Sequence, residues 1–221
     1  MPFKADPFLL EPAFTAPPAQ LVLGPLHVWR LVAADLSLLS DAERDHAKKI
    51  RSEPARAAFI AGRSGVRRVA SRYSKIPPGE LVWETAADGK PYFANVGIHF
   101  NLSHTGGTVV AAFSGSAVGI DIEPRGRCRD FAGIANRFFH PAEAAAIKDE
   151  EQFLRIWTGK EAMLKLSGEG ISGGLADARP GDAGTGNLRG NPVHITGFSF
   201  ENIVGAVASF EPVEVKGWFQ L

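Results

Sequence analysis

The chain contains very little cysteine, and no charge of one sign dominates it. Cys128 is the single cysteine in 221 residues, which excludes both a disulfide and a cysteine-based zinc site within one chain. Lysine plus arginine and aspartate plus glutamate number 24 each, so the overall charge favours neither nucleic acid nor a membrane as partner. We therefore expect no nucleic acid and no membrane among its partners, and we expect a monomer.

Long apolar runs are also missing. No stretch approaches the length of about 20 apolar residues that a membrane-spanning helix needs. Residues 1–20 carry scattered prolines and acids without a continuous apolar stretch, which is untypical of a signal peptide. These features predict an extended N-terminal arm over residues 1–20 and a cytoplasmic location.

The sequence does contain enough apolar residues, 45%, for a sizeable globular core. Ser40 with Glu43 has the spacing of a helix-capping box, and Gly168 fits a helix end. Ser114-Gly115-Ser116 predicts a hairpin between two strands. Strands grouped in hairpins indicate an α+β fold. The expected helices follow Ser40 and span about 53–76, 130–139 and 141–167; the expected strands cover 26–32, 81–85, 98–103, 108–113, 117–123 and most of 192–221.

One segment of the chain is strongly basic. Between residues 48 and 75 the only acid is Glu53, beside the basic residues Lys48, Lys49, Arg51, Arg56, Arg63, Arg67, Arg68, Arg72 and Lys75. Such a stretch in a neutral protein predicts either a partner with phosphates or an acidic surface, or a helix with a solvated basic face. The sequence leaves both interpretations open.

The segment "AVGIDIEP" (117–124) places two carboxylates in a strand-like run. Because successive strand side chains point to opposite faces, Asp121 and Glu123 share one face and Ile120 and Ile122 share the other. Two like charges on one face repel each other. The pattern indicates either a positive group beside the acids or a half-solvated strand with one face in water.

Three further motifs carry reactive side chains. The helix over 150–167 places Trp157, Lys160, Glu161 and Leu164 at i, i+3, i+4 and i+7, and Glu161 and Lys165 at i, i+4. "FNLSHTGG" (100–107) puts Ser103 and His104 before two glycines, where a ligand can approach the backbone, and "DGKP" (88–91) carries Lys90. Taken singly, these are also typical of a surface ion pair, a structural histidine and a tight turn.

Together, "GKPYF", "FNLSHTGG", "VGIDIEP" and "WTGKEAMLKLSGEGIS" resemble the 4′-phosphopantetheinyl transferases in order and approximate spacing. The motifs cover residues 89–172, and the chain length resembles the Sfp type. This resemblance implies two pseudo-symmetric subdomains, each with a small, mainly antiparallel sheet and a long helix. We expect them at 21–114 and 115–221, after the arm 1–20, with the active site at their interface.

The resemblance implies a Mg²⁺-dependent reaction. The 4′-phosphopantetheine arm of coenzyme A moves to a serine of an apo acyl or peptidyl carrier protein, giving the holo carrier and adenosine 3′,5′-bisphosphate. Hard carboxylate oxygens suit Mg²⁺, and the implied ligands are Asp121, Glu123 and Glu161. Glu161 is the implied base, with Lys160 and Lys165 as further catalytic groups. The implied contacts with coenzyme A are Lys90, Pro91, Ser103, His104, Lys160 and Lys165, with Arg51 and Arg56 as upstream candidates.

One position departs from the family pattern. Gly159 stands inside "WTGKEA", where the family commonly has a larger residue, and glycine costs a helix interior about 0.8–1.0 kcal/mol relative to alanine.

The sequence leaves two alternative functions open: a coenzyme-A-binding regulator without turnover and a metal-dependent phosphohydrolase. The choice of carrier, whether in fatty acid, polyketide or nonribosomal peptide biosynthesis, has no sequence signal that we recognise.

Overall fold

The computed structural model describes residues 9–22, 24–168, 174–181, 184–212 and 214–221. The chain forms two compact units. The N-terminal unit comprises residues 14–117 and 214–221, and the C-terminal unit comprises residues 1–13 and 118–213. Each unit has its own β-sheet and its own long helix, which confirms the predicted α+β class.

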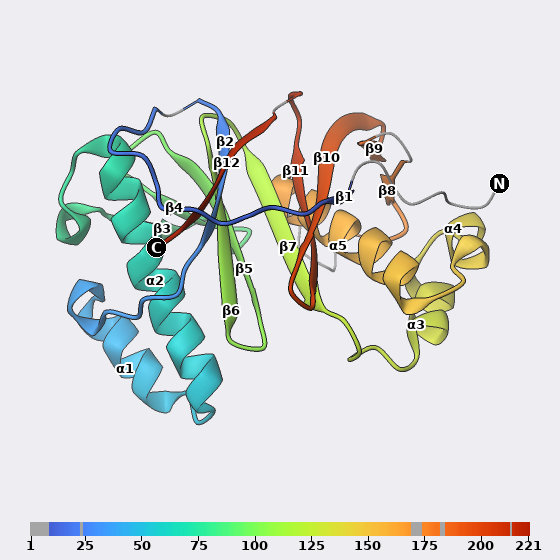
Figure 1. The fold of residues 1–221 in the computed structure, drawn as a ribbon, viewed down its shortest axis with the longest axis horizontal. Helices are drawn as coiled ribbons and strands as arrows, with labels where there is room; N and C mark the ends of the chain where they lie inside the picture. Colours follow the sequence, from blue (N-terminus) through green and yellow to red (C-terminus); the bar gives the residue numbers. More distant parts are fainter. Residues whose placement is uncertain (1–8, 23, 169–173, 182–183, 213) are drawn as a thin grey trace. The chain divides into compact units, whose positions relative to one another are not determined.

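The N-terminal unit contains a four-stranded sheet in the order β12-β2-β6-β5, in which β5, β6 and β2 pair antiparallel and β12 pairs parallel with β2. A separate hairpin joins β3 to β4. The helix α2 packs against β6 (Figure 1). The elements are β2 (Leu26–Arg30), η1 (Leu36–Leu38), α1 (Asp41–Lys49), α2 (Glu53–Ser74), η2 (Pro78–Glu80), β3 (Trp83–Thr85), β4 (Pro91–Phe93), β5 (His99–Thr105), β6 (Thr108–Ser114) and β12 (Val215–Gln220).

Local sequence signals account for the helices of this unit. The side chain of Ser40 accepts from the Glu43 backbone and the side chain of Glu43 accepts from the Ser40 backbone, so the predicted capping box starts α1. In α2, a Cβ added at Gly65 would lie 2.9 Å from Leu31 Cδ1, whereas one added at Gly62 would make only ordinary contacts at 3.6 Å. Gly65 therefore lets the helix approach the end of β2 closely.

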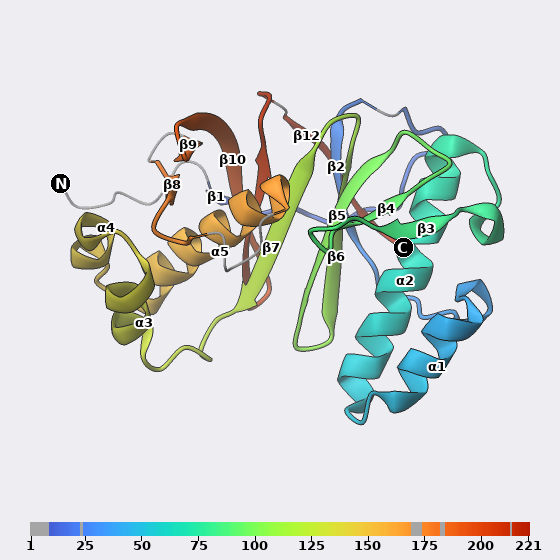
Figure 2. The same cartoon turned by 180° about the vertical axis from the view of Figure 1, so that it is seen from behind.

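The C-terminal unit contains a six-stranded sheet in the order β7-β11-β10-β9-β8, with β1 pairing parallel to β10. Its long helix α5 packs on β7 and β11 (Figure 2). Gly168 ends this helix with a φ of 84°, as predicted. The elements are β1 (Leu9–Leu10), β7 (Val118–Pro124), α3 (Phe131–Phe138), α4 (Pro141–Ala146), α5 (Glu150–Ser167), β8 (Ala178–Pro180), β9 (Thr185–Leu188), β10 (Asn191–Phe200) and β11 (Ile203–Ser209).

The structure differs from the sequence-based expectations in three places. The predicted hairpin at 114–116 is wrong, because β6 pairs with β2 and β5 while β7 pairs with β11. The stretch 170–191, whose content of Gly and Asp predicts a loop, includes the short strands β8 and β9, although 169–173 and 182–183 lie outside the described residues. The last strand, β12, belongs to the sheet of β2 and so lies in the N-terminal unit.

The expected N-terminal arm is only partly described, since residues 1–8 lie outside the described residues. Its remaining part is tied down by backbone pairing: Leu9–Leu10 pairs with β10 and Thr15 forms a bridge to Phe219. Among the helices that the structure describes, none combines the length and the apolar character needed to cross a bilayer.

Candidate functional site: carboxylates between β7 and α5

Asp121 belongs to β7, on the face that packs against α5, and is buried, with only 5% of its surface exposed. The face of β7 that it shares with Gly119 and Glu123 packs on α5, while Ile120 and Ile122 are buried on the other face. The expectation of a half-solvated strand is therefore wrong. Asp121 does have a positive group beside it, because its Oδ1 lies 2.6 Å from Lys165 Nζ.

A glycine in β7 permits this close packing. A Cβ at Gly119 would lie 2.0 Å from the backbone oxygen of Ala162 and 2.5 Å from the backbone nitrogen of Leu166. Only a residue without a side chain lets the strand backbone come so near the helix backbone. Gly119 thus allows the acids two and four residues later to meet α5, a role that the sequence analysis missed.

The helix α5 presents one row of side chains to the two acids of β7. Trp157, Glu161 and Lys165 are spaced i, i+4 and i+8 and so lie on one face. The side chain of Trp157 hydrogen-bonds Glu123, and Lys165 pairs with Asp121. Glu161, 6% exposed, lies near enough to feel the charges of both acids.

These buried carboxylates change each other's protonation. Burial raises the pKa of Glu161 to about 7, repulsion from Asp121 adds to the rise, and the Lys165 charge opposes it. Burial also raises the pKa of Glu123, again with repulsion from Asp121. Glu161 Oε1 is buried and has no hydrogen-bond partner among the described residues. The site therefore holds an excess of negative charge that favours a cation.

The predicted metal ligands are thus brought together, but not as a preformed cage. In the described ranges of the chain, no group of three or more His, Cys, Asp or Glu side chains is arranged to hold a metal ion. The role of Asp121, Glu123 and Glu161 as ligands stays a prediction.

Lys160 lies apart from this cluster. Its side chain is fully buried, and its Nζ pairs with Glu143 Oε2 at 2.8 Å and donates to the backbone oxygens of Leu175 and Ala178. Of the residues that helical spacing grouped together, Trp157 and Glu161 therefore face the acids of β7, whereas Lys160 does not. Nothing in the sequence singled out Glu143 as its partner.

Gly159, which departs from the family pattern, also has a packing role. A Cβ at this position would lie 3.1 Å from Cγ of Pro180 in β8. The glycine accommodates the approach of β8 to α5, so a bulkier side chain here would have to displace Pro180.

The remaining predicted contacts with coenzyme A lie in the N-terminal unit. Lys90 follows the Asp88–Gly89 turn, where its backbone N–H donates to Asp88 Oδ1 at 2.9 Å, and Pro91 opens β4. Burial lowers the pKa of the Lys90 ammonium. Ser103 and His104 are neighbours in β5 and so point to opposite faces: Ser103 is 5% exposed and buried, whereas His104 is exposed.

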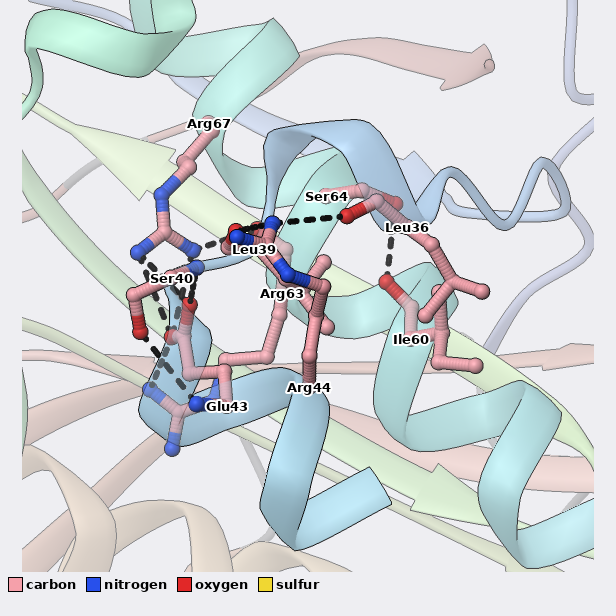
Figure 3. Close-up of polar contacts among 9 residues, drawn as sticks. All are labelled: Leu36, Leu39, Ser40, Glu43, Arg44, Ile60, Arg63, Ser64 and Arg67. Atoms are coloured by element: carbon pink, nitrogen blue, oxygen red, sulfur yellow. Dashed lines mark hydrogen bonds and ion pairs between the residues drawn. The ribbon is translucent and has the colours of Figure 1, made fainter. Parts of the chain in front are cut away.

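The basic segment is largely paired with acids from α1 and the loop before it. Arg67 and Arg63 reach from α2 to Glu43, at 3.0 and 3.5 Å, as Figure 3 shows. Arg68 pairs with Asp35 at 2.6 Å. These pairs supply structural partners for the middle of the segment. Arg51, in contrast, is exposed, and Arg56 is bound by its helix neighbour Glu53, so both candidates lie at the surface.

The Glu43 cluster lines a cavity of about 490 Å³ in the N-terminal unit. The guanidinium carbons of Arg63 and Arg67 lie 4.1 and 5.1 Å from the centre of the Trp83 ring. Glu43 also accepts from the Ser40 backbone at 2.9 Å, so one carboxylate joins the start of α1 to α2 (Figure 3). This network mainly fixes α1 on α2.

Comparison with known proteins adds an independent observation. Residues 117–204 match the family model of the 4′-phosphopantetheinyl transferase superfamily. The chain is 33% identical to the 4′-phosphopantetheinyl transferase HetI of Nostoc sp. over 71% of its own length and 74% of that protein. It is 37% identical to psf-1 of Bacillus pumilus and 31% identical to Sfp of Bacillus subtilis, both described as 4′-phosphopantetheinyl transferases. These two alignments span 59% and 63% of the respective relative, less than two thirds of its length.

Proposed function

The chain belongs to the 4′-phosphopantetheinyl transferase superfamily, and from that membership we propose that it transfers 4′-phosphopantetheine from coenzyme A to a serine of an apo carrier protein. The observation that carries this proposal is the meeting of β7 and α5. There Asp121, Glu123 and Glu161 interact electrostatically, with Lys165 beside them. The Lys165 ammonium group can stabilise negative charge on a diphosphate, and the buried carboxyl of Glu161 can exchange a proton during the transfer.

The reaction exchanges one phosphorus–oxygen bond for another. The serine oxygen attacks the β-phosphorus, and the bond from that phosphorus to the oxygen bridging it to the α-phosphate breaks. Adenosine 3′,5′-bisphosphate leaves with the bridging oxygen. Such a transfer depends on positioning and charge neutralisation more than on covalent help from the protein.

Glu161 is the proposed proton acceptor. Its pKa of about 7 makes it a stronger base than an ordinary glutamate, and its Oε1 is buried without a hydrogen-bond partner among the described residues. It takes the serine proton directly or through a water. Lys165 supplies an ammonium group next to Asp121, where it offsets charge on the diphosphate.

A divalent cation fits the same residues. Carboxylate oxygens are the ligands that Mg²⁺ prefers. Burial, with added repulsion from Asp121, raises the pKa values of Glu123 and Glu161, so a bound cation would favour their charged forms. Asp121, Glu123 and Glu161 would hold the ion, with Glu161 binding it through one carboxylate oxygen and accepting the serine proton on the other. When bound, Mg²⁺ would offset part of the negative charge of the acids and of the coenzyme A diphosphate.

The contacts with the nucleotide end remain part of the proposal. By likeness to the family motifs they are Lys90, Pro91, Ser103 and His104, with Arg51 and Arg56 as surface candidates. The active site at the interface of the two subdomains, the monomeric state, the cytoplasmic location and the biosynthetic pathway stay predictions.

The decisive experiment is mass spectrometry of apo acyl and peptidyl carrier proteins incubated with the chain, coenzyme A and Mg²⁺. We expect a carrier to gain the mass of phosphopantetheine, with equimolar adenosine 3′,5′-bisphosphate released. Coenzyme A hydrolysis with unmodified carriers would instead indicate a phosphohydrolase. Binding of coenzyme A without any product would indicate a regulator. A carrier whose serine is replaced by alanine is the matched control.

A further inference from the structure

A single buried ammonium group joins two segments of the C-terminal unit to α5. Lys160 Nζ lies 2.8 Å from Glu143 Oε2, 2.9 Å from the oxygen of Leu175 and 2.5 Å from the oxygen of Ala178. Its three hydrogens thus have three acceptors. It also lies 4.8 Å from the centre of the Phe139 ring. No ammonium hydrogen is left over for a substrate phosphate.

These partners come from different parts of the chain. Glu143 belongs to α4, and Phe139 directly follows α3. Leu175 and Ala178 lie beyond the end of α5, and Ala178 is the first residue of β8. Both carbonyls accept a hydrogen bond from the lysine ammonium. Lys160 therefore connects α4 and the segment 175–178 to the middle of α5.

The next residue of the helix is the proposed base. Successive residues of an α-helix differ in direction by about 100°, so Lys160 and Glu161 point to different sides of α5. Glu161 is directed to the acids of β7 together with Trp157 and Lys165. Fixing Lys160 on its own side restricts rotation of the helix about its axis. The same contact therefore restricts where Glu161 lies.

We propose that Lys160 is a positioning residue: it fastens α4 and the segment 175–178 to α5, holds Glu161 towards Asp121 and Glu123, and does not touch coenzyme A. This assignment rests on the proposed function. It separates the two lysines of "KEAMLK", because Lys165, 28% exposed at its side chain, remains the one placed to meet a phosphate. The gain from such positioning is in turnover rather than in affinity for coenzyme A.

The test uses a mutant cycle of Lys160→Met, Glu143→Gln and the double variant, with Lys165→Met as the control on the same helix. Lys160→Met leaves the Glu143 carboxylate without its cation, so the melting temperature should fall. Adding Glu143→Gln removes that unpaired charge and should restore part of the loss. Glutamine still accepts from the His140 backbone, which Glu143 Oε2 now does at 3.1 Å.

Binding and turnover are then measured separately. We expect the dissociation constant for coenzyme A, measured calorimetrically in EDTA, to match wild type in all three cycle variants and to rise about tenfold in Lys165→Met. Carrier modification with saturating substrates, well below every melting temperature, should fall at least about tenfold in Lys160→Met. It should stay low in the double variant, which still lacks the ties to Leu175 and Ala178.

Other results overturn the assignment. A tenfold loss of coenzyme A affinity in Lys160→Met would make Lys160 a phosphate contact. Turnover that recovers together with the melting temperature in the double variant, or that never falls, would leave Lys160 a merely structural residue. A wild-type protein that modifies no carrier would end the proposed function and this role with it. If the wild type transfers normally and only Lys160→Met binds coenzyme A more weakly, the role of Lys160 fails while the proposed function stands.

Discussion

At the scale of single residues, the most distinctive feature is the raised pKa of Glu161, whose ionised form is disfavoured by burial. Glu161 has a pKa of about 7 in the folded protein against an ordinary value of 4.5, so the folded state keeps its proton to higher pH than the unfolded state. Stability from this group is present below about pH 4.5 and is lost as the pH rises through 7. The loss amounts to about 3 kcal/mol at most.

Glu161→Gln should therefore stabilise the protein at pH 8 in EDTA and leave stability unchanged at pH 4, while abolishing carrier modification. Glutamine keeps the shape but carries no charge to be repelled by Asp121. Urea unfolding at the two pH values measures the difference. Glu80→Gln, at an exposed position, is the control and should change neither value. An equal effect of Glu161→Gln at both pH values would contradict the raised pKa.

His104 offers a second test at this scale. It is exposed in β5, so His104→Ala should leave the melting temperature unchanged. If it contacts the 3′-phosphate, the variant should lose up to about tenfold of the preference for coenzyme A over 3′-dephospho-coenzyme A, which corresponds to one charge-assisted hydrogen bond. The two specificity constants measure this. His99→Ala, exposed in the same strand, is the control, and equal discrimination by wild type and His104→Ala would place the contact elsewhere.

Residue positions were predictable from the sequence only as far as local periodicity reaches. The alternation of side chains along β7 placed Asp121 and Glu123 on one face. It could not show that α5 covers that face and leaves only 5% of the Asp121 surface exposed. Helical spacing grouped Lys160 with Glu161. The partners of Lys160 are Glu143, Leu175 and Ala178, which are distant in sequence and carry no signal of their own.

At the scale of elements, the packing of β7 on α5 requires a glycine. Gly119→Ala would place a Cβ 2.0 Å from the backbone oxygen of Ala162. Neither atom can rotate away, so the clash can be relieved only if the strand and the helix separate. We expect a loss of about 1–3 kcal/mol or more in unfolding free energy, with loss of carrier modification. Gly62→Ala is the matched control.

In α2, the new Cβ of that control would lie 3.6 Å from Val109, an ordinary contact. Gly62→Ala should thus be neutral or stabilising by up to about 1 kcal/mol, since alanine favours helix interiors. Denaturant unfolding compares the two variants. A Gly119→Ala protein as stable as wild type would show that β7 and α5 do not approach so closely.

Element ends were predicted better than element partners. The capping box of Ser40 and Glu43 and the stop at Gly168 are local signals, and the structure places both as the sequence indicates. The turn signal at 114–116 is equally local, but strand pairing is not. The strand β7 pairs with β11 in a register that places Ile122 opposite Gly205. A turn motif describes only the local backbone, so it cannot specify a partner strand that lies so far along the chain.

At the scale of the whole molecule, the end of the chain completes the sheet at its beginning. Strand β12 pairs parallel with β2, and Phe219, 9% exposed, lies 5.0 Å from the Trp29 ring, measured between ring centres. The N-terminal unit is therefore discontinuous in sequence. Its core cannot be completed until the last eight residues, 214–221, are available.

Deleting residues 214–221 should consequently expose β2, although the deletion lies almost two hundred residues downstream of that strand. Loss of Phe219 alone should cost about 3–5 kcal/mol through the cavity it leaves, and loss of the strand adds the backbone pairing with β2. Hydrogen exchange should then show faster exchange in Leu26–Arg30 than in β11, taken as the internal reference. Phe219→Ala is the control, since it keeps the backbone of β12 and should lose stability with less exposure of β2 amides. Unchanged protection of β2 in the truncated chain would mean that β12 does not hold the N-terminal sheet together.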